Sequence, residues 1–178
     1  MTIFDPKPKA LIASTFFFLA GLYSWIFLVS DHRAGLPLFI FYITIVVNTF
    51  FSLVLFSSII PRENVTQKIL DGLLIVCYLL LAQGMRDPAS FLFFDTLLFI
   101  FATAKYAFLL GVVNHPRLLK RKILADLSGV CAGVLAFGGL VAGYSYVATW
   151  ALAIVFVIAN FILFFIFPLY RLDSRGHL

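Results

Sequence analysis

Residues 36–60 read LPLFIFYITIVVNTFFSLVLFSSII and contain no Asp, Glu, Lys, Arg or His. A helix rises about 1.5 Å per residue, so this run is long enough to cross the roughly 30 Å hydrocarbon core of a bilayer. Apolar runs in core helices of soluble proteins are shorter. The stretch therefore predicts a transmembrane helix, and it makes the bilayer the solvent for the rest of the chain.

The composition of the whole chain agrees with a membrane protein. Of its 178 residues, 63% are hydrophobic and 12% are charged, Phe occurs 22 times, and the mean hydropathy is +1.08. A soluble domain has about 25% charged residues and could not bury this much apolar surface. The composition excludes a water-soluble enzyme domain, a disordered chain and a fibrous repeat.

Nucleic-acid, metal and disulfide chemistry are not expected. The formal net charge is +5, but no polar face interleaves basic and aromatic residues as nucleic-acid binding would require. Cys77 and Cys131 both lie in apolar runs, and no Cys or His spacing is typical of a metal site. We predict no cofactor, no metal and no nucleic-acid partner, with membrane lipids as the surroundings.

Five further apolar runs predict an all-α, polytopic transmembrane bundle of six spans, forming one domain over residues 1–178. The predicted spans are residues 10–30, 36–60, 69–85, 88–113, 123–143 and 144–169. Helix breakers separate them, notably in residues 31–37, 86–88 and 143–145. Connections this short favour three antiparallel hairpins. The first span is longer than the apolar part of a signal peptide, so we predict a retained helix.

The distribution of Lys and Arg predicts the orientation in the membrane. Only Arg33 and Arg86 fall on the side of the odd-numbered connections. Ten basic residues fall on the opposite side, namely Lys7, Lys9, Arg62, Lys68, Arg117, Lys120, Arg121, Lys122, Arg171 and Arg175. Because cytoplasmic loops carry the excess of Lys and Arg, we predict a multi-pass protein of the cell membrane with both termini in the cytoplasm.

Four charged residues fall inside the predicted spans, namely Asp71, Asp95, Lys105 and Asp126. Each is costly there unless it is paired, hydrated or able to reach the interface. Asp71 and Asp126 lie about one turn beyond Lys68 and Lys122, and the long side chain of Lys105 can reach the same level. We predict an ionic cluster of Lys105 with Asp71 and Asp126. The alternative is that the two acids stabilise the starts of their helices while Lys105 reaches the interface alone.

Asp95 lies too far along its helix to pair directly with Lys105, ten residues later. Asn48 and Asn160 fall near the middle of their spans. Together these residues could line a polar path with Asp95 at its outer end and Lys105 at its inner end. The alternative is that the asparagines are ordinary interhelical hydrogen-bonding residues.

The fifth span carries a continuous face of small residues, at alternating spacings of four and three. These residues are Ala125, Gly129, Ala132, Ala136, Gly139 and Gly143. In lipid, small side chains let helix backbones approach closely. The face therefore predicts helix packing within the chain, a homo-oligomer contact, or a groove for a flat apolar ligand. All three interpretations remain open at this point.

A weak internal repeat relates the third and fifth spans. Shifting residues 68–84 by 54 positions gives nine identities over 17 positions, including Val76-Cys77 on Val130-Cys131. Such a repeat places both copies in the same direction, unlike the inverted repeats of many secondary transporters.

Three classes of function fit these features. The intramembrane charges favour a small transporter or channel for a proton, an ion or a small solute. The small-residue face suits a non-catalytic scaffold or accessory subunit that docks on a partner membrane subunit or on a second copy. An enzyme or binding protein for lipid or quinone is the third class, although the chain lacks HExxH, GxSxG and Walker A motifs and no catalytic residue is predicted.

Overall fold

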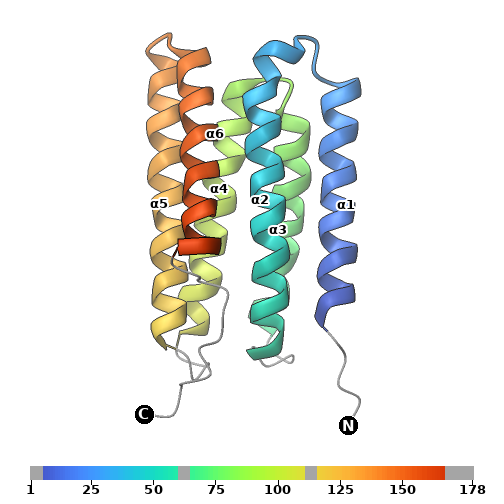
Figure 1. The fold of residues 1–178 in the computed structure, drawn as a ribbon, viewed down its shortest axis with the longest axis vertical. Helices are drawn as coiled ribbons and strands as arrows, with labels where there is room; N and C mark the ends of the chain where they lie inside the picture. Colours follow the sequence, from blue (N-terminus) through green and yellow to red (C-terminus); the bar gives the residue numbers. More distant parts are fainter. Residues whose placement is uncertain (1–5, 60–64, 111–115, 167–178) are drawn as a thin grey trace.

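The computed structural model describes residues 6–59, 65–110 and 116–166 and places six α-helices in one bundle (Figure 1). The helices are α1 (Pro6–Phe27), α2 (His32–Ile59), α3 (Val65–Gly84), α4 (Pro88–Leu109), α5 (Pro116–Val141) and α6 (Ser145–Phe161), and a π-helical turn (Ile162–Ile166) follows. All six are long and apolar enough to cross a membrane. The predicted all-helical fold with six such helices is confirmed.

Successive helices run in opposite directions, and α1 lies at one edge of the bundle (Figure 1). Helix α1 packs against α2 and α3, whereas α4 packs against both α3 and α5, and α6 lies against α2 and α5. Because α4 lies against two neighbours in this way, the division into three hairpins stays a prediction. The core between the helices is dominated by aromatic and leucine side chains, among them Phe41, Tyr42, Leu81, Phe91 and Leu92.

Several helix ends differ from the predicted ones. Residues 31–37 do not form a loop, because α2 already begins at His32 and Pro37 lies buried inside it. The Asp31 carboxylate accepts hydrogen bonds from the backbone N–H groups of Arg33 at 2.9 Å and Ala34 at 3.3 Å, and so caps the helix. Pro37 is the sixth residue of α2, so it removes one backbone hydrogen bond from the second turn while the helix continues past it.

The start of α5 is also earlier than predicted. The helix begins at Pro116 rather than at residue 123, which brings Lys122 into the helix rather than leaving it in a loop. Predicted span ends at residues 60, 111–113 and 167–169 lie outside the described residues, as do Arg62, Arg171 and Arg175.

Two predicted connections are present, each one residue earlier than predicted, at residues 85–87 and 142–144. At residues 142–144, Gly143 has a φ of +88°, and the Tyr144 N–H donates to the Gly139 carbonyl at 2.9 Å. Between α3 and α4, the Asp87 carboxylate caps α4 by accepting from the Ser90 hydroxyl at 2.7 Å and the Ser90 N–H at 2.9 Å. These hydrogen bonds from Ser90 lower the pKa of Asp87.

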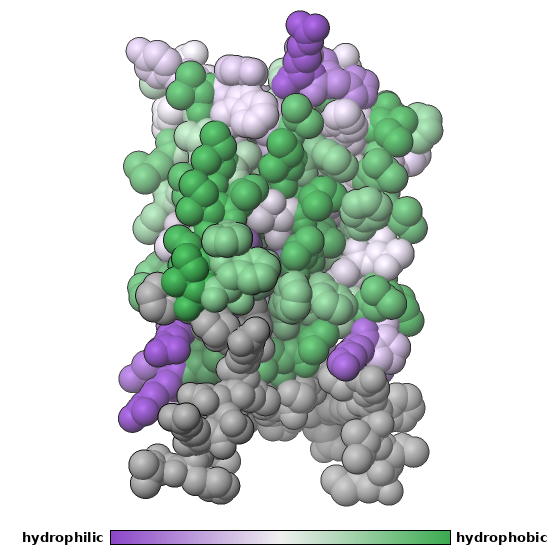
Figure 2. All heavy atoms as spheres, viewed as in Figure 1, coloured by the Kyte–Doolittle hydropathy of each residue, from purple (hydrophilic) through white to green (hydrophobic). Residues whose placement is uncertain are grey.

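The outer surface of the bundle is apolar over most of its height. Figure 2 shows hydrophobic residues covering the middle of one face, with hydrophilic residues gathered towards the ends. Large apolar side chains point outward from several helices, such as Ile12, Leu135 and Val141, each more than 70% exposed. In water such a surface would promote aggregation, whereas in lipid it is the expected outer surface of a multi-pass membrane protein.

Candidate functional site: an intramembrane ionic cavity

A cavity of about 730 Å³ lies among helices α1 to α5, in the half of the bundle that contains the starts of α1, α3 and α5. We call it the ionic cavity. Most of its lining is apolar, but charged and polar side chains gather in it, namely Lys9, Asn48, Thr49, Ser52, Asp71, Tyr78, Lys105, Tyr106, Lys122 and Asp126. This volume is typical of small-molecule sites, and so is an apolar wall with a few convergent polar groups.

The first ion pair of the cavity joins α3 to α4. Lys105 Nζ lies 2.5 Å from Asp71 Oδ1. The Lys105 side chain is only 8% exposed, whereas that of Asp71 is 43% exposed. The buried ammonium group therefore has a partner at the border of the bundle, which offsets much of the cost of placing it among apolar helices.

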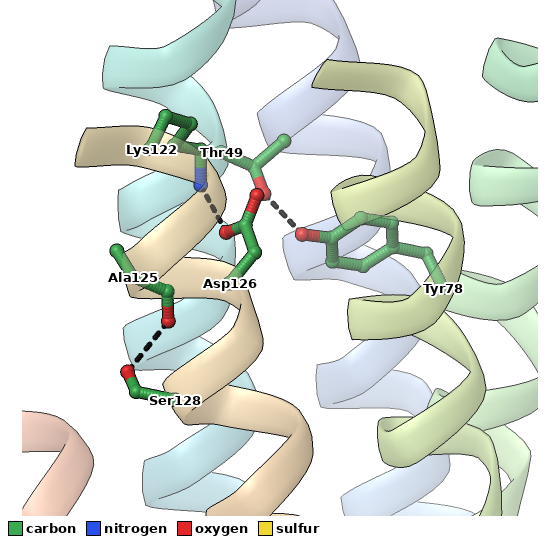
Figure 3. Close-up of polar contacts among 6 residues, drawn as sticks. All are labelled: Thr49, Tyr78, Lys122, Ala125, Asp126 and Ser128. Atoms are coloured by element: carbon green, nitrogen blue, oxygen red, sulfur yellow. Dashed lines mark hydrogen bonds and ion pairs between the residues drawn. The ribbon is translucent and has the colours of Figure 1, made fainter. Parts of the chain in front are cut away.

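The second ion pair lies within α5, where Lys122 Nζ is 2.5 Å from Asp126 Oδ1 (Figure 3). Both side chains are buried. The two ammonium groups of the cavity also converge on one ring, because Lys105 Nζ and Lys122 Nζ lie 5.7 and 5.3 Å from the centre of Tyr106. Cation–π attraction adds to both pairs at these distances.

A hydroxyl pair completes the polar part of the cavity. Thr49 on α2 and Tyr78 on α3 are hydrogen-bonded to each other, and both lie beside Asp126 and Lys122 in Figure 3. The second carboxylate oxygen of Asp126 is buried and has no hydrogen-bond partner within the described part of the chain. Buried carboxylate oxygens are normally satisfied, so this oxygen can accept a proton donor from a water or a ligand.

An aromatic stack lines the end of the ionic cavity that faces the other half of the bundle. The rings of Phe17 on α1 and Tyr78 on α3 stack with their centres 4.5 Å apart and their planes at 20°. The Tyr42 hydroxyl donates to the Phe17 carbonyl at 2.9 Å, which fixes this level of α1 against α2.

A second cavity, of about 460 Å³, lies beyond that stack on the same line between α1 and α3. We call it the upper cavity. Its lining residues are Ala20, Tyr23, Ser24, Leu28, Leu79, Ala82, Gln83 and Arg86. These residues come after Phe17 along α1 and after Tyr78 along α3. The stack therefore lies between the two cavities, along the line where α1 meets α3, which we call the seam.

The structure brings together part of the predicted polar set. Asp71, Lys105, Asp126 and Asn48 all line the ionic cavity. The three predicted cluster members belong to two separate ion pairs, because Asp71 pairs with Lys105 whereas Asp126 pairs with Lys122. Both acids pair with lysines, whereas the alternative interpretation placed the two acids at helix starts and left Lys105 to reach the interface alone.

Asp95 and Asn160 lie apart from the cavity. Asp95 is fully buried between α4 and α5, and neither of its carboxylate oxygens has a hydrogen-bond partner among the described residues. Asn160 donates to the Phe156 carbonyl of its own helix at 3.0 Å. Neither residue lines the ionic cavity or the upper cavity, so the predicted path through Asp95 and Asn160 does not follow these two cavities.

The small-residue face of α5 is rotated relative to the buried face. Gly129 and Ala136 are buried, Ala125, Ala132 and Gly139 are half-buried, and Gly143 is exposed. A Cβ at Gly129 would lie 2.7 Å from the Phe99 ring, and one at Gly133 3.0 Å from Asp95 Oδ2. Both glycines thus let α4 approach α5 within the chain, while docking of a partner on this helix stays a prediction.

Several lining residues were not among the predicted site residues. The charge pattern assigns Lys122 to a cytoplasmic loop, although its position four residues before Asp126 is a signal for an ion pair on one helix. Thr49, Tyr78 and Tyr106 carry no local signal, since aromatic and hydroxyl residues are common in apolar spans. Within the described residues, no group of three or more His, Cys, Asp or Glu side chains is placed to hold a metal ion.

Comparison of the chain with protein-family models, with curated proteins and with solved structures found no match. The function must therefore be argued from the cavities, their charges and their position between the helices.

Proposed function

We propose that this chain is a small multi-pass membrane transporter that binds an ion or small solute in the ionic cavity and passes it along the seam between α1 and α3. One observation carries the proposal: two cavities occupy opposite halves of the same seam and are separated by the Phe17–Tyr78 stack. A scaffold needs no such pair of cavities, whereas alternating access needs a site that can be opened to either side.

The stack is a suitable gate because little free energy holds it. An aromatic pair contributes about 0.5–1.5 kcal/mol beyond its buried area. Helix α1 packs against α2 and α3 at the edge of the bundle, so a small displacement of its first half separates the two rings. Motions of this kind occur in about microseconds to milliseconds.

The ion pairs supply binding groups that do not have to be created when a solute arrives. In this mechanism a charged solute breaks the Lys105–Asp71 pair by replacing one of its two members. The other pair, Lys122–Asp126, keeps the cavity polar. Lys105 acts as the internal counter-ion, because its ammonium group is buried in the cavity. The proposed orientation has both termini in the cytoplasm of a cell membrane, so the ionic cavity lies in the cytoplasmic half and the upper cavity in the outer half.

The test is charge movement by purified protein in proteoliposomes adsorbed on a solid-supported membrane. Concentration jumps are made separately in H⁺, Na⁺, K⁺, chloride and octanesulfonate. We expect a protein-dependent current for at least one of these ions. Absence of current for all five, from protein that elutes as a single folded species, would contradict the proposal.

The matched variants are Phe17→Ala and Phe18→Ala. Phe17 belongs to the stack and is 5% exposed, whereas Phe18 is 40% exposed and lines neither cavity. Phe17→Ala removes the barrier between the cavities, so we expect faster ion movement than in the unmodified protein. Phe18→Ala is expected to leave the current unchanged. Equal effects of the two substitutions would show that the stack is not the gate.

A further inference from the structure

We infer that Asp95, on α4, is a proton-binding site: in the folded protein its carboxyl group holds a proton at the contact between α4 and α5, as a neutral acid. The bound ligand is H⁺, and the site is separate from the ionic cavity. The inference goes beyond the proposed function and does not depend on it, because proton binding can be measured without any transport.

Asp95 is enclosed by the protein on all sides. The residue is 0% exposed, and both of its carboxylate oxygens are buried without a hydrogen-bond partner in residues 6–59, 65–110 and 116–166. Asp95 lines neither the ionic cavity nor the upper cavity. Water that enters either cavity therefore does not touch this carboxyl group.

Gly133 lets the backbone of α5 close over the Asp95 carboxyl group. A Cβ at Gly133 would lie 3.0 Å from Asp95 Oδ2 and 2.9 Å from the hydroxyl oxygen of Thr96. The Thr96 hydroxyl donates to the Leu92 carbonyl of its own helix at 2.8 Å, so its proton is not shared with Asp95. The carboxyl group thus lies at a close contact between two helices.

The cations on the surrounding helices are placed elsewhere. Lys105 lies ten residues after Asp95 on α4, about 15 Å along the axis, and takes part in the ion pair with α3. Lys122 lies eleven residues before Gly133 on α5, about 16 Å along the axis, and takes part in the ion pair within α5. Arg86, ahead of α4, is exposed and lines the upper cavity.

The other titratable groups near this level are acids or uncharged side chains, which do not stabilise a carboxylate by charge. The acids are Asp87, eight residues before Asp95, and Asp126, seven residues before Gly133. The phenol and thiol groups on the surrounding helices are those of Tyr42 on α2, Cys77 and Tyr78 on α3, Tyr106 on α4, Cys131 on α5 and Tyr146 on α6. Residues 145–166, which include α6, contain no charged side chain.

An ionised Asp95 in these surroundings would be far more unfavourable than a protonated one. Burying a carboxylate without a cation, a hydrogen bond or water costs several times more than burying a neutral hydroxyl group without a partner. The hydrocarbon around the bundle offers no alternative solvation. The folded protein therefore keeps the proton on Asp95.

Release of this proton requires water to reach the carboxyl group, and the close contact at Gly133 has to open for that. The same two helices carry Lys105 and Asp126 of the ionic cavity. A change in the distance between α4 and α5 would therefore also move charged groups of that cavity. Proton binding at Asp95 thus favours the closed packing of α4 on α5.

The first measurement is infrared spectroscopy of the purified protein at pH 8 in a maltoside detergent, which has no carbonyl group of its own. A protonated carboxylic acid absorbs apart from the amide groups and from ionised carboxylates. We expect such a band from the unmodified protein. Asp95→Asn and, as a second replacement, Asp95→Ala should each remove the band, whereas Asp126→Asn should retain it.

The second measurement is the melting temperature as a function of pH. Above about pH 5 the carboxyl group of Asp in an unfolded chain is ionised, so unfolding releases the proton that the folded protein holds. The stability linked to this proton is lost as the pH rises, at about 3–5 °C of melting temperature per pH unit for a chain of this length. Because Asn has no proton to release, Asp95→Asn should gain that much per pH unit relative to the unmodified protein, from about pH 5 to pH 8.

The matched control is Asp87→Asn. Hydrogen bonds from Ser90 lower the pKa of Asp87, which is therefore ionised in both the folded and the unfolded state over this range. The difference in melting temperature between Asp87→Asn and the unmodified protein should not change with pH there.

Three results would overturn the inference. They are the absence of a protonated-acid band from the unmodified protein at pH 8, a band that persists after replacement of Asp95, and a pH-independent difference in melting temperature between Asp95→Asn and the unmodified protein. The first is measured on the unmodified protein, so it decides the question even where a variant does not fold. The band without any current in proteoliposomes supports the proton site and contradicts transport, and current without the band does the reverse.

Discussion

Gly21 on α1 holds the edge helix against the bundle, and replacing it with Ala is the sharpest test of the structure. A Cβ at Gly21 would lie 2.3 Å from Cε1 and 2.6 Å from Cδ1 of the Tyr42 ring. Tyr42 on α2 is 0% exposed, so its ring has no free space to move into. Gly21→Ala must therefore move α1, the Tyr42 ring, or both.

The size of the effect follows from three contributions. Overpacking of a tight contact costs about 1–3 kcal/mol. Displacement of the ring also weakens the hydrogen bond from the Tyr42 hydroxyl to the Phe17 carbonyl, with a net cost of about 0.5–1.5 kcal/mol. The better helix propensity of Ala returns about 0.5–1 kcal/mol. The expected net loss in the free energy of unfolding is about 2 kcal/mol.

The assay is the melting temperature of the purified protein in detergent, with Gly72→Ala as the matched control. A Cβ at Gly72 on α3 meets nothing within 4 Å, so only the gain in helix propensity remains. Taking about 2–4 °C per kcal/mol for a chain of this length, we expect Gly21→Ala to lower the melting temperature by about 4–8 °C. Gly72→Ala is expected to raise it by about 1–4 °C.

The opposite signs make the reasoning easy to refute. If Gly21→Ala stabilised the protein as much as Gly72→Ala, α1 could not lie against Tyr42 as described. A further check is the combination of Gly21→Ala with Tyr42→Leu, which replaces the ring that causes the clash. The two substitutions together should cost at least 1 kcal/mol less than the sum of their separate effects, because neighbouring substitutions are coupled.

Three further predictions concern ion pairing and helix contacts. Asp71→Asn leaves the buried Lys105 ammonium without its charged partner. It should lower the free energy of unfolding by about 1–2 kcal/mol, less than for a fully buried pair because Asp71 is 43% exposed. Adding Lys105→Met should recover most of the loss in melting temperature. Gly133→Ala should lower the melting temperature and Gly138→Ala should not, since a Cβ at Gly133 would lie 2.9 Å from a side-chain oxygen of α4 and one at Gly138 meets nothing within 4 Å. Hydrogen bonds at the start of α4 lower the pKa of Asp87. The stabilisation that the Asp87 carboxylate provides is therefore present above the pKa of Asp in the unfolded chain, about 3.9, and is lost as the pH falls through the lower pKa of the folded state. In Asp87→Asn the melting temperature should fall less steeply with decreasing pH over that range.

The six helices could be predicted from the sequence because in lipid every span must satisfy its own backbone and face apolar surroundings. Helix starts were harder to predict. Pro37 predicts a loop, but Asp31 caps α2 ahead of it, and the helix continues through the proline at the cost of one backbone hydrogen bond. Local rules identify residues that can begin or end a helix, and tertiary packing decides which of them does so.

The depth of the charged residues along their helices could be predicted from the sequence, but their ion-pair partners could not. The rise per residue placed Asp71, Lys105 and Asp126 at one level, and all three line the ionic cavity. Which lysine meets which acid depends on how each helix is rotated about its axis, and apolar residues on every side of these spans hide that rotation from the sequence. Asp95 illustrates the same point, since its helix turns it towards Gly133 of α5 and away from both cavities.

The walls of the ionic cavity differ in a way that bears on how it could work. On one side, Gly129 lets the Phe99 ring lie against the α5 backbone, only three residues from Asp126, so the charges of α4 and α5 rest on tightly packed helices. On the other side, α1 contributes mainly apolar side chains and lies tightly against α2 at Gly21, about three turns beyond Lys9. A helix held at Gly21 can tilt its first half, including Phe17, without disturbing either ion pair, at the cost of the hydrogen bond from Tyr42 to the Phe17 carbonyl. Motion of α1 would therefore change access to the cavity while the binding groups stay in place, which is the separation of roles that a transporter requires.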